Sequence, residues 1–240
     1  MTRIIASRPN TVVAVLGSVL GIIVLTVGTA SAQTGGVVGR VTFVGDPPPP
    51  AEATANVVNP EVCGETVQPV GLVVGPDRGV QYAVVQIVGA SGSLSVPAEA
   101  PALSQDGCRF SPRVVVVGTS QPMDILNNDN ILHNVHLHSE ANPEKNIGQP
   151  GFLKKLSVTF EEPEIFRVGC DVHRWMSGTI VVTDNPFVAV TDENGAFSLA
   201  GVPPGTYQLT VWHELLGEQT QEVVVTEGEE TNTRFELAAN

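Results

Sequence analysis

The sequence predicts an all-β protein built from two β-sandwiches. Gly and Pro account for 24 and 18 of the 240 residues, and short runs rich in Val lie between them. Gly and Pro interrupt regular structure and Val favours the extended backbone, so this pattern predicts many short strands joined by turns. No stretch keeps apolar residues at a helical spacing. About 208 residues follow an N-terminal targeting segment, enough for two small domains.

Residues 1–32 have the features of an export signal. Two arginines precede an apolar run at 11–27, and the tripeptide at 30–32, Ala-Ser-Ala, is a small-residue cleavage site. We expect cleavage there, which places the mature chain in the periplasm or outside the cell. An uncleaved membrane anchor is the alternative, because the apolar run is nearly long enough to cross a bilayer.

The charge balance narrows the class of partner. The formal net charge is −13 at pH 7, and an acidic surface repels the phosphates of nucleic acid, so nucleic acid is not an expected partner. Acidic residues concentrate at 140–144, 161–164 and 218–230. They either steer a basic protein partner or keep the surface solvated.

The first strands lie in the N-terminal third of the mature chain. We expect one at 35–43, ending before four consecutive prolines at 47–50 that cannot continue in a sheet. A second is expected at 80–88, followed by a polar loop at 90–107.

The expected strands follow one another more closely after residue 108. Six short strands alternate with turn signals, as in a sandwich: 113–117, 123–127, 133–138, 154–160, 164–168 and 179–183. The tail carries five more strands, separated by an Asn-Gly and a Pro-Pro-Gly turn signal: 187–191, 196–199, 207–213, 219–225 and 233–237.

One short loop concentrates metal-binding chemistry. Cys170, His173 and Met176 lie in Cys-Asp-Val-His-Arg-Trp-Met, between two expected strands, and His133 begins a strand upstream. Two imidazoles, a thiolate and a weak thioether form the ligand set of a type 1 copper ion, whereas zinc sites seldom recruit Met. The sequence therefore predicts one type 1 copper ion bound by His133, Cys170, His173 and Met176, and a role in electron transfer.

The other two cysteines, Cys63 and Cys108, are expected to pair. Disulfides are common in exported proteins, and Cys170 is already assigned to the copper loop. Two separate buried thiols are the alternative.

Strand alternation separates the histidines near the copper loop. It places His133 on one face and His136 and His138 on the other. The latter two are therefore not expected to bind the same ion. They are either exposed strand residues or a second, surface metal site.

The copper loop and the segment His133-Asn134-Val135-His136 resemble those of cupredoxins of the amicyanin and plastocyanin type. The resemblance covers about residues 108–184. It implies a Greek-key sandwich that carries single electrons outside the cytoplasm. It also implies that Asn134 hydrogen-bonds across to the copper loop and holds it in place.

The loop departs from that family at Asp171, Arg174 and Trp175, where the family is more apolar and carries proline. Because these residues are less apolar, the hydrophobic electron-exit patch that the family has around an exposed ligand His is not expected here in the same form. For Trp175, packing against the loop is the simpler interpretation, and shielding the site or contacting a partner is the alternative.

A second resemblance lies in the tail. Residues 191–197 and 202–207 are similar to the carboxypeptidase regulatory-like, prealbumin-type β-sandwich, and Gly39-Arg40-Val41 matches the leading strand of that family. The copper domain would then be inserted into this module. The whole arrangement also resembles bacterial proteins called methylamine-utilisation-like. The expected organisation is a signal peptide at 1–32, a strand and Pro-rich connector at 35–60, the cupredoxin at 61–185, and the regulatory-like sandwich at 186–240. The segment at 35–60 is a candidate part of the C-terminal sandwich.

These observations favour a periplasmic or secreted electron carrier. Its expected partner is a c-type cytochrome or a periplasmic dehydrogenase, with a membrane contact only if the signal is uncleaved. We expect no enzyme, because the chain lacks a Gly-x-Ser-x-Gly elbow, a phosphate loop, a dinucleotide fingerprint and a His-Glu-x-x-His motif. One alternative is a copper-trafficking or storage protein with His136 and His138 as extra ligands. Another is a glycan- or surface-binding module with a structural or degenerate metal site.

Overall fold

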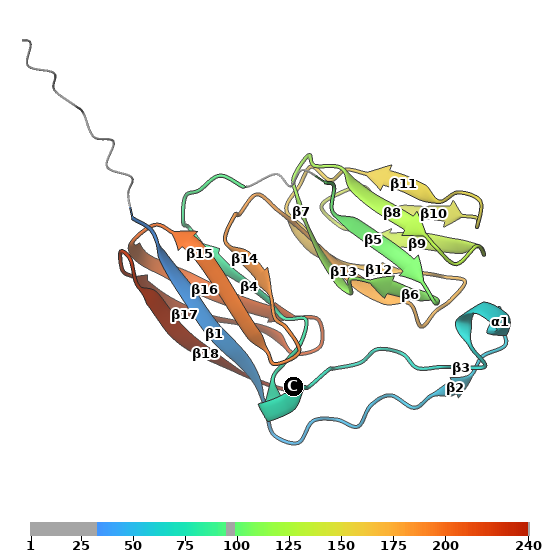
Figure 1. Cartoon of the computed structure of the whole chain (residues 1–240), viewed down its shortest axis with the longest axis horizontal. Helices are drawn as coiled ribbons and strands as arrows, with labels where there is room; N and C mark the ends of the chain where they lie inside the picture. The colour runs from blue at the N-terminus through green and yellow to red at the C-terminus, as the bar shows by residue number, and fades with distance from the viewer. Residues whose placement is uncertain (1–32, 95–98, 240) are drawn as a thin grey trace, which may run out of the picture. The chain divides into compact units, whose positions relative to one another are not determined.

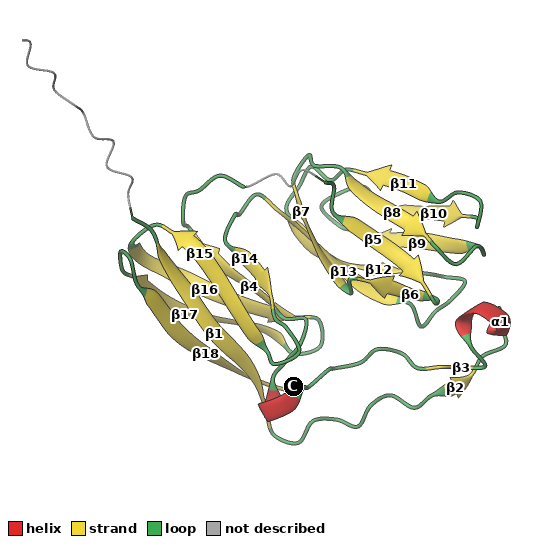
Figure 2. Cartoon of the chain, in the orientation of Figure 1, coloured by secondary structure: helices red, strands yellow, loops and turns green. Residues whose placement is uncertain are grey.

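The computed structural model describes residues 33–94 and 99–239, which form an almost entirely β structure (Figures 1 and 2). The expected signal at 1–32 lies outside the described residues. Within the described ranges, helix is limited to α1 (Pro60–Cys63) and the short 3-10 turn η1 (Pro76–Arg78). None of the described helices has the length and apolarity needed to cross a membrane. The all-β prediction is confirmed.

The first sandwich consists of a five-stranded and a four-stranded sheet. The five-stranded sheet has the order β10 (Lys145–Gln149), β9 (His133–His138), β12 (Glu164–Gly169), β13 (Ser177–Thr183) and β7 (Val114–Gly118). The four-stranded sheet has the order β11 (Lys155–Val158), β8 (Met123–Asn127), β5 (Ala102–Asp106) and β6 (Arg109–Ser111).

Side chains that alternate along these strands form the core between the two sheets. Val135 and Leu137 of β9 and Ile125 of β8 are fully buried in one cluster. Cys170 and Met176, in the loop after β12, belong to the same cluster. The copper loop is therefore anchored in the hydrophobic core of this sandwich.

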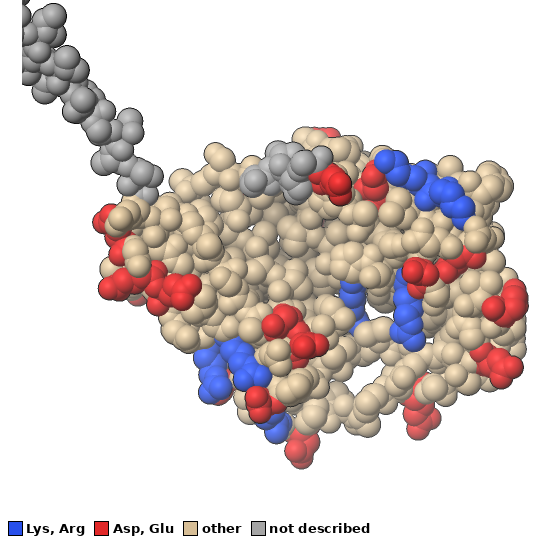
Figure 3. Space-filling view, viewed as in Figure 1, with Lys and Arg blue, Asp and Glu red and all other residues tan. Residues whose placement is uncertain are grey.

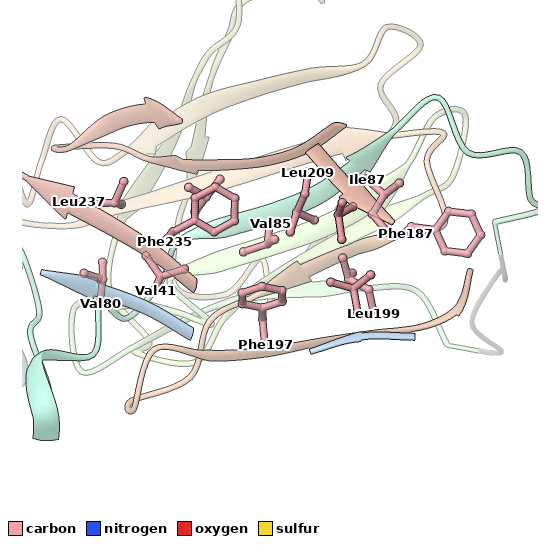
Figure 4. Close-up of a cluster of buried hydrophobic side chains, with 14 of the residues drawn as sticks. Val41, Val80, Val85, Ile87, Phe187, Phe197, Leu199, Leu209, Phe235 and Leu237 are labelled. Carbon is pink, nitrogen blue, oxygen red and sulfur yellow. The ribbon is translucent and has the colours of Figure 1, made fainter. Parts of the chain in front are cut away.

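The second sandwich combines the N-terminal strand with the tail. One sheet has the order β15 (Ala196–Val202), β1 (Gly35–Val44) and β18 (Glu230–Ala238), with β1 antiparallel to β15 and parallel to β18. The other has the order β14 (Val188–Val190), β4 (Val84–Val88), β16 (Gly205–His213) and β17 (Gly217–Val225). Figure 4 shows Val85 and Leu209 packed with Phe197 and Phe235 in the core between the sheets. The prediction of two β-sandwiches is confirmed.

Several elements differ from the sequence-based expectations. Residues 84–88, inside the range expected for the copper domain, form β4 and pair with β14 and β16 because Val85 and Ile87 face the core of the second sandwich. Strand β5 lies within the expected loop at 90–107. Its composition is mostly polar, but Leu103 and Gln105 alternate into the first core.

A long excursion between β1 and β4 carries the disulfide. It contains the two-residue strands β2 (Thr54–Ala55) and β3 (Thr66–Val67), which pair with each other around α1. Cys63, the last residue of α1, is bonded to Cys108 in the turn between β5 and β6, so the expected disulfide is present. We call residues 52–68 the strap.

Candidate metal centre

Three side chains from two segments converge at one end of the first sandwich. The Nδ1 atoms of His133 and His173 are 2.9 Å apart, and Cys170 Sγ lies 3.9 Å from the first and 3.7 Å from the second. All three residues are buried. Imidazole nitrogens and thiolate sulfurs bind a first-row metal at about 2.0–2.3 Å, so ligands of one ion lie about 3–4 Å apart. The three atoms have the separations of ligands around a single ion.

Each imidazole has an acceptor at its other nitrogen. His133 Nε2 is 2.8 Å from the carboxylate of Asp129, and His173 Nε2 is 3.1 Å from Oδ1 of Asn59. Because both partners accept hydrogen bonds, the ring protons are placed on the Nε2 atoms. The two Nδ1 lone pairs then face each other at 2.9 Å, an arrangement that repels unless a cation lies between them. Metal-binding histidines commonly have such outer partners.

Burial keeps the histidines in the form that binds a metal. Desolvation lowers the pKa of His173 to about 4, helped by the neighbouring His133. Desolvation is also the main reason why the pKa of His133 is lowered, although Asp129 acts in the opposite direction. Both imidazoles are therefore neutral at neutral pH, as ligation requires.

Backbone hydrogen bonds hold the sulfur of Cys170. The N–H of Asn134 lies 3.5 Å from this sulfur, and the N–H of His173 lies 3.4 Å from it. Such bonds orient a thiolate and tune a bound metal. Met176 follows in the same loop and is buried in the same core, and its N–H donates to the carbonyl of His173 at 2.8 Å. The loop thus folds back on itself and places Met176 in the same core as Cys170.

The side chain of Asn134 joins β9 to the copper loop. Its Oδ1 accepts hydrogen bonds from the N–H groups of Asp171, at 2.6 Å, and Val172, at 3.2 Å. Its Nδ2 donates to Asp171 and to Asn146. These contacts are of the kind that the resemblance implied for this residue.

Asp129 is a site residue that sequence reasoning missed. Besides His133, its carboxylate accepts the N–H groups of Gly107 and Cys108 at 2.6 and 2.8 Å, and its side chain is 4% exposed. It therefore connects the histidine to the β5–β6 turn. The available signal was its position four residues before His133, in a turn-rich segment that reads as an ordinary loop.

The strap covers the outer edge of His173. This histidine is fully buried, whereas the resemblance implied an exposed ligand. Asn59 contacts it from a left-handed backbone conformation (φ 47°, ψ 50°) at the start of α1, and the disulfide at Cys63 fixes that helix. Trp175 packs edge-on against His173 and donates its Nε1 proton to the carbonyl of Cys108. No local sequence pattern indicates the position of the strap, because the contact joins residues 114 positions apart.

His136 and His138 lie on the opposite face of β9, as strand alternation predicts. Their rings stack at 3.8 Å between centroids, away from the group formed by His133, Cys170 and His173. Hydrogen bonds to Glu144 and then Asp171 raise the pKa of His136. The structure does not bring these two histidines to the first group.

The donor atoms of the first site suit copper. Two neutral imidazoles and a thiolate, with a buried thioether in the same loop, form a set that serves both Cu(I) and Cu(II). The loop lies at one end of a β-sandwich, as the resemblance of the sequence to cupredoxins implied.

Comparisons with known proteins give one family match and several similar solved structures. A family model described as the carboxypeptidase regulatory-like domain matches residues 177–238, which confirms the module predicted in the tail. The solved structures similar to the chain include amicyanin from Paracoccus versutus, with 16% identity, covering 41% of this chain and 97% of amicyanin at a TM-score of 0.32. A Cu(I) amicyanin variant has 20% identity over 41% of this chain and 98% of its own, also at 0.32.

A copper-containing nitrite reductase from Thermus scotoductus SA-01 is also similar, with 19% identity over 39% of this chain and a TM-score of 0.30. The chain spans 24% of the length of that reductase. A search of curated proteins finds no match.

Proposed function

We propose that this protein carries single electrons through one type 1 copper ion bound by His133, Cys170 and His173, with Met176 as the weak axial ligand. One observation carries the proposal. Two neutral imidazole nitrogens face each other at 2.9 Å beside the only free cysteine among the described residues, inside a hydrophobic core. A shared metal ion accounts for this arrangement, and the sulfur donor selects copper over harder cations.

The surrounding residues prepare the site for electron transfer. A bound copper ion would supply the Cu(I)/Cu(II) couple. Asn134 holds the loop, Asp129 and Asn59 fix the two rings, and two backbone N–H groups point at the sulfur. A frame held at so many points favours one geometry in both oxidation states, which keeps rearrangement during electron transfer small.

The proposed setting is the periplasm or the cell exterior, with a c-type cytochrome or a periplasmic dehydrogenase as partner. The disulfide supports an oxidising compartment, and the net charge of −13 supports a partner with a basic docking surface. In Figure 3 the acidic side chains are spread over the visible face, and no single patch dominates it. General attraction fits this distribution better than one fixed acidic docking patch.

Titration of the metal-free mature protein with Cu(II) tests the proposal. We expect a strong visible thiolate-to-copper band that disappears and returns as the protein is reduced and reoxidised. Cys170→Ser should remove the band. His138→Gln, a change on the opposite face of β9, should leave it intact. Tight Cu(I) binding without the band would favour copper trafficking, and no response to copper would favour the binding-module alternative.

A further inference from the structure

A second group of potential ligands lies on the outer face of β9. His136 Nε2 is 2.9 Å from Glu144 Oε1, and the stacked ring of His138 lies beside it. One ligand atom from each of these three residues lies within 4.8 Å of the others. We call His136, His138 and Glu144 the outer cluster.

We propose that the outer cluster binds a second metal ion, a divalent ion of the Zn²⁺ or Cu²⁺ class. Two imidazoles and a carboxylate suit these borderline ions, whereas Mg²⁺ and Ca²⁺ prefer oxygen ligands and Cu(I) prefers sulfur. Three protein ligands leave a coordination position for water. The histidines are two residues apart on a strand, so the backbone already holds both on one face.

Access and charge also favour an ion here. The side chain of Glu144 is 63% exposed and that of His136 is 19% exposed, so an ion can reach the cluster without unfolding of the sandwich. The carboxylate of Asp171 lies 3.2 Å from His136 Nδ1 and adds a second negative charge. Arg167 contacts His138 Nε2 at 3.3 Å, but its side chain is exposed and can turn toward solvent when an ion binds.

The outer cluster is connected to the copper loop through Asp171. One oxygen of this carboxylate faces His136, and the other accepts hydrogen bonds from Asn134, at 3.0 Å, and Asn146, at 2.6 Å. Asn134 in turn holds the backbone of the copper loop, and its N–H points at the sulfur of Cys170. An ion in the outer cluster therefore adds positive charge beside this connection. It should favour Cu(I) over Cu(II) and raise the reduction potential, an effect that rests on the proposed function.

The binding test uses a variant that lacks the type 1 thiolate. Cys170→Ser protein is titrated with Cu²⁺ and with Zn²⁺ by calorimetry, and the Cu²⁺ form is measured by electron paramagnetic resonance. We expect a nitrogen- and oxygen-ligated Cu²⁺ signal and binding that weakens at least tenfold when His138→Gln or Glu144→Gln is added. Glu162→Gln, an exposed carboxylate outside the cluster, is the matched control and should bind like the parent.

The comparison within this background isolates the outer cluster from any binding by His133 and His173. Equal affinity with and without His138→Gln and Glu144→Gln would overturn the second site. That result would leave a copper band in the wild-type chain unaffected, so the two proposals fail independently. In copper-loaded wild-type protein, added Zn²⁺ should raise the reduction potential, and His138→Gln should abolish the shift. An unchanged potential despite bound Zn²⁺ would refute the connection through Asp171.

Discussion

Replacing Asn134 with Ala should loosen the copper loop and destabilise the metal-free protein. Two N–H groups, those of Asp171 and Val172, lose their acceptor. A net hydrogen bond contributes about 1 kcal/mol, and a donor left unpaired away from water costs about 1–3 kcal/mol. Asp171 is exposed, so water can replace its partner, whereas Val172 is half-buried. We therefore expect a loss of about 2–3 kcal/mol.

Urea unfolding of the metal-free mature protein measures this loss as a lower midpoint at an unchanged slope. Asn232→Ala, which removes an exposed Asn from strand β18, is the matched control and should change stability by less than about 0.5 kcal/mol. In the copper-loaded form, Asn134→Ala should also release copper faster to a chelator. If Asn134→Ala unfolds like the control and retains copper like the wild type, the role assigned to this side chain is wrong.

Three further predictions concern the strap and the second core. Changing Cys63 and Cys108 to Ser should lower the free energy of unfolding by about 4 kcal/mol, by the loop-entropy estimate for a separation of 45 residues. An unfolding midpoint equal to that of the oxidised wild type would contradict this prediction. Asn59→Ala removes the acceptor of His173 and should speed copper removal by a chelator, with an unchanged rate as the contrary result. Burial lowers the pKa of His213, so this residue stays neutral in the folded state, whereas it takes up a proton in the unfolded chain below pH about 6.5. Stability should therefore fall as the pH drops below that value, and less steeply in His213→Gln.

The sequence was informative where one residue pattern determines the structure. The Val-rich runs between turn residues predicted the strands, and alternation along 133–138 separated His133 from His136 and His138. The copper loop combines residue types that seldom serve another purpose together. Local patterns of this kind can be interpreted without knowing which distant segments are in contact.

Other features depend on contacts between distant segments. Asp129 is indistinguishable from a turn residue until β9 and the β5–β6 turn are brought together. Asn59 contacts His173 from the start of α1, a helix whose last residue is bonded to Cys108. Strand β10 is polar and lies at the edge of its sheet, so it shows little hydrophobic alternation. These features follow from tertiary structure that a single sequence does not specify locally.

The most direct test of the copper site is the anomalous diffraction of copper in crystals of the loaded protein, measured in both oxidation states. We expect one copper ion within about 2.0–2.3 Å of His133 Nδ1, His173 Nδ1 and Cys170 Sγ, with little movement of these atoms between the two states. A copper ion that binds without Cys170, or only at the outer cluster, would contradict the account.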